Sequence, residues 1–584
     1  MNRPPGDDDS RAKTLEERMN EYLERYHARR GSSPARATQD QAPASDSGAL
    51  AKINFDMRPE ELIAYLDQYI VRQDEAKAVL ATKICTHLNR ARYLMSRGGD
   101  DPADGVGLIK NNVLLIGPTG VGKTYMVKLI AAKLGVPFVK GDATKFSETG
   151  YVGGDVEDLI RELVHQAGDD IELAQFGIVY VDEVDKIASS KGLIGPDVSR
   201  TGVQRALLKP MEETEVDLKV PHDPVSQLQA IEAYRRTGKR QRRTINTRYI
   251  LFIMSGAFSD LPEVIKRRRN RQQMGFGAKM KNPRDDHELL KEVTAQDLVE
   301  YGFETEFVGR LPVVVVLDEL SKDDLYQILR NPNNPVIVSK KRDFAAYGID
   351  LRFTDAALKE LAARAYEMKT GARALVSVVE KATLPFEKHL PSTDISRVVI
   401  TPEVVADPEG ALKQLLEDPE APNWQEAYEQ AGREEREQLI KMIQRRQVLY
   451  SERLPKPLTP ARMELIAEEF YRCGMSMEVA FNRVLERFEQ VQEFEESFFA
   501  RYGIKISFTD AAQVAIVTAA TAEGTDVPAY CGQLGQLLEP ALRLVQDRTG
   551  ISEFVLPEEA VLETEKYLHE LFERHYHGAV HREA

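Results

Sequence analysis

One run of eight residues has the composition and spacing of a phosphate-binding loop. It fits the pattern GxxxxGK[ST], follows the apolar run 112–116 and precedes a helical stretch, YMVKLIAAKLG. The glycines allow backbone N–H groups to surround phosphates, the lysine adds a positive charge at the β- and γ-phosphates, and the threonine hydroxyl can ligate Mg²⁺. The alternative, a glycine-rich turn with an exposed lysine, is disfavoured by this context. The eight residues are Gly117, Pro118, Thr119, Gly120, Val121, Gly122, Lys123 and Thr124.

An acidic pair provides the second half of such a site. Asp182 and Glu183 follow the hydrophobic run 178–181 in GIVYVDEVDK. We expect Asp182 to hold Mg²⁺ through water and Glu183 to polarise the attacking water as a general base. Taken alone, such a pair is more often a helix cap or a solvated edge. Together with the glycine-rich loop it predicts hydrolysis of a nucleoside triphosphate.

These residues need a β-sheet to position them, and the sequence pattern predicts one. Strand-like runs at 112–116, 177–181 and 250–254 are separated by helical segments such as 155–166 and 202–212. This alternation is typical of an α/β fold with a parallel sheet. After residue 320 the pattern becomes mostly helical.

The C-terminal half contains an internal repeat. The segment FAAYGIDLRFTDAA (344–357) returns as FARYGIKISFTDAA (499–512), and ten of the fourteen positions are identical at a constant shift of 155. A chance match of low-complexity sequence is the less favoured alternative, so a helical domain has been duplicated. Between the copies, the charge-dense segment 424–454 predicts a connecting helix with a solvated face.

Composition excludes several classes of protein. The 584 residues carry a net charge of −15, which argues against a nucleic-acid coat. The longest apolar runs, such as 313–317, are too short to span a bilayer, and the first ten residues do not resemble a secretory signal. The three cysteines are too widely spaced for a zinc knuckle or a disulfide framework, so we expect a cytoplasmic protein. They are Cys85, Cys473 and Cys531.

Five motifs together resemble the ClpX family of AAA+ unfoldases over residues 59–402: IGPTGVGKT, DATKFSETGYVGGDVEDLI, IVYVDEVDKIAS, EFVGRLPVVV and MKTGARAL. The resemblance implies an AAA+ P-loop core with a small α+β lid domain, ATP and Mg²⁺ as cofactors, and a homo-oligomeric ring, usually a hexamer. Such a ring threads unfolded or tagged proteins through a central pore and has no proteolytic site of its own. The domains expected are a disordered arm with a short helix (1–52), the large ATPase domain (53–317), the lid (318–405), a helical linker (406–475), a second lid-like domain (476–575) and a tail (576–584).

The same resemblance assigns further residues. Arg310 matches the arginine finger, which enters the neighbouring subunit's site, and Arg373 matches the sensor-2 arginine of the lid. Without their motifs, both would be read as arginines in surface salt bridges. Ser255 lies in the sensor-1 region, although a polar residue often ends a strand. The pore loop corresponds to Gly150, Tyr151, Val152 and Gly153, and the loop that docks on a ClpP-type peptidase corresponds to Met274, Gly275 and Phe276.

Other features depart from that family. The four-cysteine zinc domain is replaced by the cysteine-free arm, and Arg72 replaces a glycine in the adenine-pocket motif 69–73. The second copy has no arginine between Tyr502 and Leu542, so it lacks a sensor-2 arginine. Two alternatives remain: a regulatory ring without a peptidase, and a nucleic-acid remodelling motor that uses the basic stretches 235–248 and 266–271. Neither stretch has interleaved aromatic residues to stack bases, so nucleic acid is the less favoured partner.

Overall fold

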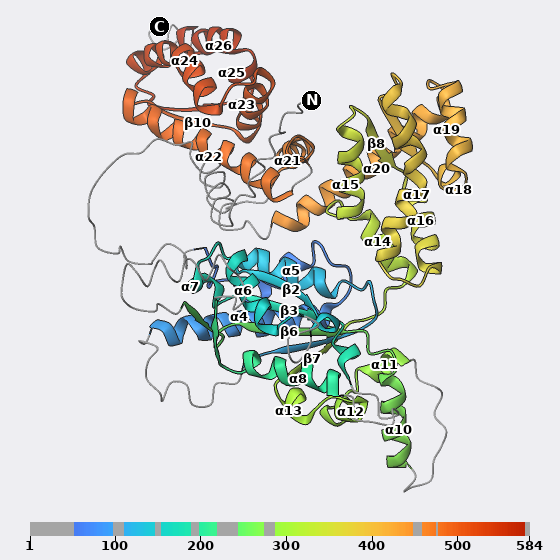
Figure 1. The fold of residues 1–584 in the computed structure, drawn as a ribbon. Coiled ribbons are helices and arrows are strands. Elements are labelled where there is room, and N and C mark those ends of the chain that lie inside the picture. The colour runs from blue at the N-terminus through green and yellow to red at the C-terminus, as the bar shows by residue number, and fades with distance from the viewer. Residues whose placement is uncertain are drawn as a thin grey trace, which may run out of the picture. The chain divides into compact units, whose positions relative to one another are not determined.

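The computed structural model describes residues 52–96, 110–146, 154–188, 198–218, 243–273, 286–447, 458–474 and 477–577. Its centre is a five-stranded sheet in the order β2-β3-β6-β1-β7 (Figure 1), in which every neighbouring pair is parallel. The strands are β1 (Val113–Ile116), β2 (Phe138–Asp142), β3 (Ile178–Asp182), β6 (Leu251–Gly256) and β7 (Val313–Val316). The predicted parallel α/β sheet is therefore confirmed.

Burial explains why these segments form the sheet. All four residues of β1, the first four of β3 and all six of β6 are buried. Strands covered on both faces have such continuous runs, because neither face meets water. As the strands are parallel, their carboxyl ends meet at one edge.

Helices and short elements surround this sheet. Helices α5 and α6 pack against β2 and β3, and α4 contacts β7. The helices are α3 (Pro59–Leu66), α4 (Asp74–Ser96), α5 (Lys123–Leu134), α6 (Val156–Gln166), α7 (Ile171–Ala174), α8 (Val198–Met211), α10 (Leu261–Gln273), α11 (Asp286–Leu290), α12 (Ala295–Tyr301) and α13 (Thr305–Gly309). The described part of the large domain also contains two short 3₁₀ helices, η1 (Ala143–Lys145) and η2 (Val184–Ile187), and an antiparallel pair, β4 (Glu215–Asp217) with β5 (Thr244–Asn246).

Within its described residues, the remaining chain is mostly helical and contains two parallel strand pairs. The first copy comprises α14 (Lys322–Arg330), α15 (Pro335–Ala345), β8 (Asp350–Phe353), α16 (Asp355–Glu367), α17 (Arg373–His389), η3 (Leu390–Ser392), β9 (Arg397–Ile400), α18 (Pro402–Ala406) and α19 (Pro408–Glu417). After α20 (Pro422–Arg446), the second comprises α21 (Pro460–Arg472), α22 (Met477–Tyr502), β10 (Lys505–Phe508), α23 (Asp510–Glu523), α24 (Val527–Thr549), β11 (Glu553–Leu556), α25 (Glu559–Leu562) and α26 (Thr564–His577). Among the helices of the described ranges, none is both long and apolar enough to cross a membrane.

The repeated segment has the same local structure in both copies. Thr354 caps α16 by accepting a hydrogen bond from the Ala357 N–H, and Thr509 caps α23 through the Ala512 N–H. A threonine at this position satisfies a backbone donor that the helix leaves free. The identity FTDAA therefore preserves a strand end and a helix start.

Packing does not follow the expected boundaries at 405 and 475. The first hydrophobic core extends through Leu415, and the second begins at Leu439 in α20 and includes Met463 and Phe470 in α21. The expected linker thus contributes to both cores, because α20 is long enough to pack against β9 and against α21.

Candidate functional site

The glycine-rich loop connects β1 to the amino end of α5. Gly120 and Gly122 have φ of 77° and 97°, in the left-handed region that favours glycine. Gly122 precedes α5 without a side-chain cap, and a Cβ placed on it would meet no atom within 4 Å. The space beside Gly122 is therefore open at the amino end of α5, where the first N–H groups of a helix have no partner within the helix and suit an anion.

Lys123 is buried beside this loop, with 9% of its surface exposed. Its Nζ donates to the carbonyl oxygens of Gly117 at 2.5 Å and Pro118 at 2.9 Å. Burial lowers the pKa of Lys123 to about 8, because it disfavours the charged form. A phosphate would offer charged acceptors, which bind an ammonium more strongly than neutral carbonyls do.

A chain of hydroxyl groups leads from the loop to the acidic pair. The Thr124 hydroxyl donates to the Tyr180 oxygen at 3.1 Å, and the Tyr180 hydroxyl donates to Ser255 Oγ at 2.7 Å. Ser255 in turn donates to Asp182 Oδ1 at 2.6 Å. The structure thus brings together Thr124, Asp182 and Ser255, which the sequence suggested separately.

Tyr180 was missed by the sequence analysis. It is fully buried in β3 between Val179 and Val181. A buried tyrosine usually finds a hydrogen-bond partner for its hydroxyl, so a tyrosine within an aliphatic strand was the available signal.

The carboxylate of Asp182 accepts hydrogen bonds on both oxygens. Oδ1 also accepts from the backbone N–H of Glu183 at 3.1 Å, and Oδ2 lies 2.9 Å from Nζ of Lys140 on β2. Burial alone would raise the pKa of Asp182, but the hydrogen bond from Ser255 and the charge of Lys140 lower it below the usual value. With Thr124 Oγ1 at 3.5 Å from Asp182 Oδ2, the site has the hard oxygen donors that Mg²⁺ prefers.

Glu183 lies at the strand end with a left-handed backbone. Its φ is 58°, an uncommon conformation for a residue other than glycine, and its side chain is exposed. The next carboxylate, Asp185, is buried and accepts from the N–H groups of Ala257 at 3.3 Å and Phe258 at 3.4 Å. Asp185 thereby fixes the ends of β3 and β6 against each other, and Glu183 is left facing solvent.

The small domain contributes Arg373, the first residue of α17. The preceding Ala372 N–H donates to the Gly120 carbonyl at 2.9 Å, and Gly371 approaches Thr119 so closely that a Cβ on it would lie 2.8 Å from the Thr119 oxygen. The charge of Arg373 is also one of the influences on the pKa of Lys123. Arg373 therefore belongs to the same cluster as the glycine-rich loop.

Arg310 lies away from the cluster around Lys123. Its guanidinium forms an ion pair with Glu212, and its backbone carbonyl accepts from Asn112 Nδ2 at 3.1 Å. It lines a cavity of about 390 Å³ that also includes His87 and Lys110. The structure of one chain does not bring Arg310 to the Lys123 cluster.

Two expected sites lie outside the described residues. They are the pore loop, Gly150 to Gly153, and the peptidase-docking loop, Met274 to Phe276. Their assignments stay predictions.

The basic stretch on α10 is paired with acidic groups. Arg268 Nε lies 2.8 Å from Asp297 Oδ1, and Arg269 Nη1 lies 3.5 Å from Glu292 Oε2. Lys266 forms an ion pair with Asp286. Much of its positive charge is therefore neutralised within the chain.

Two family models match the chain. Residues 109–314 match the AAA domain (Cdc48 subfamily), and residues 320–385 match the C-terminal, D2-small domain of ClpB protein. The first match covers the sheet with the glycine-rich loop, Asp182 and Arg310, and the second covers the start of the small domain with Arg373. Over the first segment the chain is therefore similar to the AAA domain of the Cdc48 subfamily, and over the second to the small D2 domain of ClpB.

Proposed function

We propose that the chain is an ATP-hydrolysing subunit of a ring that remodels proteins by pulling polypeptides through its pore. The observation that carries the proposal is the convergence of Lys123, Thr124, Asp182 and Ser255 at the carboxyl edge of one parallel sheet. The small domain adds Arg373 to that cluster. The family matches support a protein-remodelling AAA+ ATPase, and the ClpX-like motifs support the finer assignment.

Each residue of the cluster has a separate task. Lys123 and the loop N–H groups bind the phosphates, while Thr124 and Asp182 hold Mg²⁺, which neutralises charge on the β- and γ-phosphates when bound. Glu183 accepts a proton from the attacking water, a task that suits an ionised carboxylate beside the site. Arg373 adds positive charge from the small domain.

Assembly supplies the remaining charge. Arg310 is half exposed and separate from the Lys123 cluster of its own chain, so we assign it to the site of a neighbouring subunit. Hydrolysis then depends on a homo-oligomeric ring, for which we propose a hexamer. Its pore would grip unfolded or tagged proteins through Tyr151 and Val152, and Phe276 would dock on a ClpP-type peptidase.

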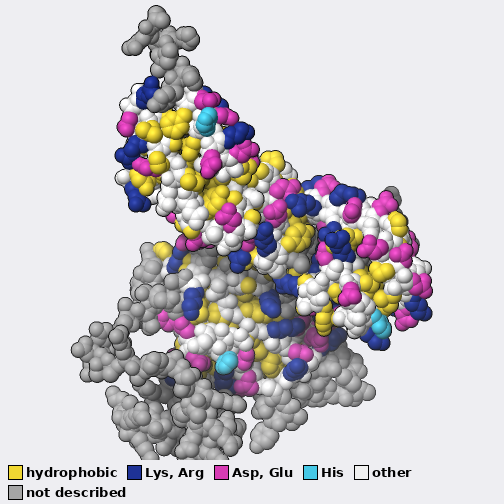
Figure 2. All heavy atoms as spheres, turned by 90° about the horizontal axis from the view of Figure 1, so that it is seen from above, with side chains coloured by type: hydrophobic (Ala, Val, Ile, Leu, Met, Phe, Trp, Pro, Cys, Tyr) yellow, Lys and Arg dark blue, Asp and Glu magenta, His cyan; other side chains and the backbone are white. Residues whose placement is uncertain are grey.

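A nucleic-acid motor is less well supported. The basic residues of α10 are paired with acidic ones. On the face drawn in Figure 2, Lys and Arg side chains are interspersed with Asp and Glu, and no large area of positive charge separates from the negative one. A nucleic-acid groove needs unpaired positive charge along its length.

The test compares Lys123→Ala with Glu183→Gln. Lys123→Ala should abolish nucleotide binding, whereas Glu183→Gln should bind ATP, lose hydrolysis and retain client proteins in a pulldown. A fluorescent ATP analogue measures binding, and phosphate release measures turnover. Equal loss of ATP affinity in both variants would contradict the separate tasks assigned to them.

The trans role of Arg310 has its own test. Arg310→Ala should bind ATP almost normally and lose turnover, and mixing it with Glu183→Gln should restore part of the activity through mixed interfaces. An isolated subunit that hydrolyses ATP as fast as the assembled protein would refute this role.

A further inference from the structure

Arg72 lies in the turn between α3 and α4, with an unusual backbone. Arg72 and Gln73 have φ of 61° and 64°, so two successive residues other than glycine are left-handed. Glycine adopts this conformation without a steric penalty, whereas a residue with a Cβ, such as arginine, does not. An arginine here accepts backbone strain, which indicates that its side chain has a task.

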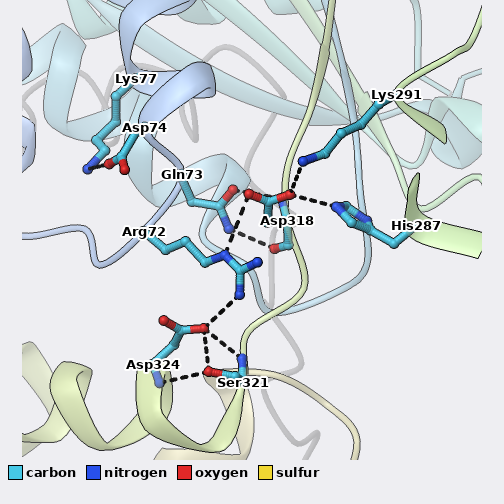
Figure 3. Close-up of polar contacts among 9 residues, drawn as sticks. All are labelled: Arg72, Gln73, Asp74, Lys77, His287, Lys291, Asp318, Ser321 and Asp324. Carbon is cyan, nitrogen blue, oxygen red and sulfur yellow. Dashed lines mark hydrogen bonds and ion pairs between the residues drawn. The ribbon is translucent and has the colours of Figure 1, made fainter. Parts of the chain in front are cut away.

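That side chain reaches the segment joining the sheet to the small domain. Arg72 Nη1 lies 3.0 Å from Asp324 Oδ2, and Arg72 Nε lies 3.5 Å from Asp318 Oδ2. Figure 3 shows the guanidinium between the two carboxylates. Asp324 is in the first turn of α14, and Asp318 lies just after β7, so one arginine holds both ends of the connection.

Gln73 reinforces the same connection through the backbone. It is buried, and its Nε2 donates to the Asp318 carbonyl at 2.7 Å while its Oε1 accepts from the Asp318 N–H at 2.8 Å. These two bonds fix the backbone of Asp318 in the orientation that presents its carboxylate to Arg72 (Figure 3).

Asp318 is also held from the opposite side. His287 Nε2 and Lys291 Nζ both lie 2.7 Å from its Oδ1. Burial alone would raise the pKa of Asp318, but the hydrogen bonds from Lys291 and His287 and the charge of Arg72 lower it. The carboxylate is therefore ionised at neutral pH and joins α11, the connection and the Arg72 turn.

A second contact ties the small domain to the phosphate loop. The N–H of Ala372 donates to the Gly120 carbonyl at 2.9 Å, next to Arg373. Leu325 in α14 and Leu375 in α17 are buried in one core, so the two contacts belong to one packed body. Fixing the connection at one end therefore restricts where Arg373 lies at the other.

We propose that Arg72 is a positioning residue for nucleotide binding. Arg72 holds the small domain in the orientation that directs Arg373 at the glycine-rich loop. The inference rests on the proposed nucleotide-binding function and adds a residue to it. Arg72 acts through its ion pairs with Asp318 and Asp324. Its role is to orient the small domain.

The experiment measures domain orientation and nucleotide affinity separately. Spin labels at the exposed positions Lys128→Cys in α5 and Lys381→Cys in α17, with the half-buried Cys473 changed to Ser, report the distance between the domains. Arg72→Met, which keeps the stem and removes the charge, should broaden the distance distribution. It should also weaken ADP binding by about fivefold, since it removes two partly exposed ion pairs.

Three further variants separate the effect of the Arg72 charge from the effects of its backbone conformation and of other charges nearby. Arg72→Lys keeps the charge and should stay within about twofold of the native ADP affinity. Arg72→Gly relieves the backbone and should still behave like Arg72→Met, because the charge is what matters. Lys322→Met removes an exposed charge from the same connection, and it should change neither the distance nor the affinity.

Two results would overturn the role of Arg72. One is an unchanged distance distribution in Arg72→Met. The other is an altered choice between ADP and GDP with the distance unchanged, which would mean that Arg72 reads the base. A native chain that binds neither nucleotide would instead refute the proposed function, and the distance measurement needs no nucleotide.

Discussion

Replacing Tyr180 with phenylalanine tests whether the hydroxyl chain organises the proposed Mg²⁺ site. The change removes one oxygen and leaves the ring in place, so it creates no cavity large enough to matter. Two neutral hydrogen bonds are lost, to Thr124 and to Ser255. At about 0.5–1.5 kcal/mol each, their loss should lower the free energy of unfolding by about 1–3 kcal/mol. We expect the lower end, because both hydroxyls keep Asp182 as a partner.

The change should also affect the Mg²⁺ dependence of ATP hydrolysis, and this effect distinguishes Tyr180 from other buried tyrosines. Burial raises the pKa of Tyr180 to about 12, so its hydroxyl stays protonated at any ordinary assay pH and donates to Ser255. Without the Tyr180 hydroxyl, the Thr124 hydroxyl keeps, among the described residues, the longer contact of 3.5 Å to Asp182. A loss of about 1 kcal/mol in Mg²⁺ binding corresponds to roughly a fivefold higher half-saturating Mg²⁺ concentration for ATP hydrolysis.

Tyr326→Phe is the matched control. The Tyr326 hydroxyl donates to Asp355 within the small domain, away from the cluster. This variant should lose stability to a similar extent and keep the native Mg²⁺ dependence. If Tyr180→Phe shifts the Mg²⁺ titration no more than Tyr326→Phe does, the hydroxyl chain has no role in metal binding. Ser255→Ala combined with Tyr180→Phe should be non-additive, since the two side chains are in contact.

Three other predictions concern single residues. Lys140→Met removes the ammonium that is paired with the carboxylate of Asp182 in the proposed Mg²⁺ site. The half-saturating Mn²⁺ concentration, measured by EPR, should fall by about two- to fivefold. An unchanged value would show that the ammonium does not compete with the metal ion for Asp182. His87 is buried with its pKa lowered to about 4, so the native state binds fewer protons than the unfolded state and stability falls as pH drops below about 6.5. His87→Gln should remove about 2 kcal/mol of the loss in unfolding free energy between pH 7 and pH 5, measured by denaturant titration, and an unchanged pH dependence would place the titration elsewhere. Gly120→Ala puts a Cβ 2.2 Å from the Thr370 oxygen and should abolish binding of a fluorescent ADP analogue, whereas Gly122→Ala, with open space, should lose affinity through backbone strain alone; equal losses would contradict the clash.

The sequence predicted those parts of the site that are local. Gly117 to Thr124 form one continuous motif, and Asp182 follows its strand directly, so neither depends on how the sheet is assembled. Lys140 and Tyr180 were missed because their contacts depend on the strand order β2-β3-β6-β1. Adjacency of β2 and β3 brings Lys140 to Asp182, and no residue pattern states that order.

Arg72 is a second case in which a contact between distant segments could not be predicted from the sequence. The resemblance to the ClpX family identified Arg72 as an arginine in place of a glycine in the adenine-pocket motif, and it did not indicate what the arginine contacts. Its partner Asp324 is 252 residues further along the chain, where nothing in the local sequence connects the two. The roles of Arg310, Tyr151 and Phe276 stay predictions.

The duplicated module shows which parts of a repeat are maintained by folding and which by function. The inner faces of the two strand pairs keep large apolar side chains, such as Phe353 and Phe508, because each covers its own core. The outer faces differ: Val399 lies in β9, which packs against α20, and is 1% exposed, whereas Val555, at the matching position, is 68% exposed.

The end of the module that carries Arg373 in the first copy has changed as well. When α17 and α24 are aligned on their buried residues, Leu375 with Cys531 and Val379 with Gly535, Arg373 falls on Ala529. An alanine cannot supply the positive charge that we propose for Arg373 at the glycine-rich loop. The second copy therefore keeps the side chains that fold the module and lacks the arginine that we assign to nucleotide binding. A function of this copy has to be sought on its own exposed surface, where residues such as Val555 replace buried ones.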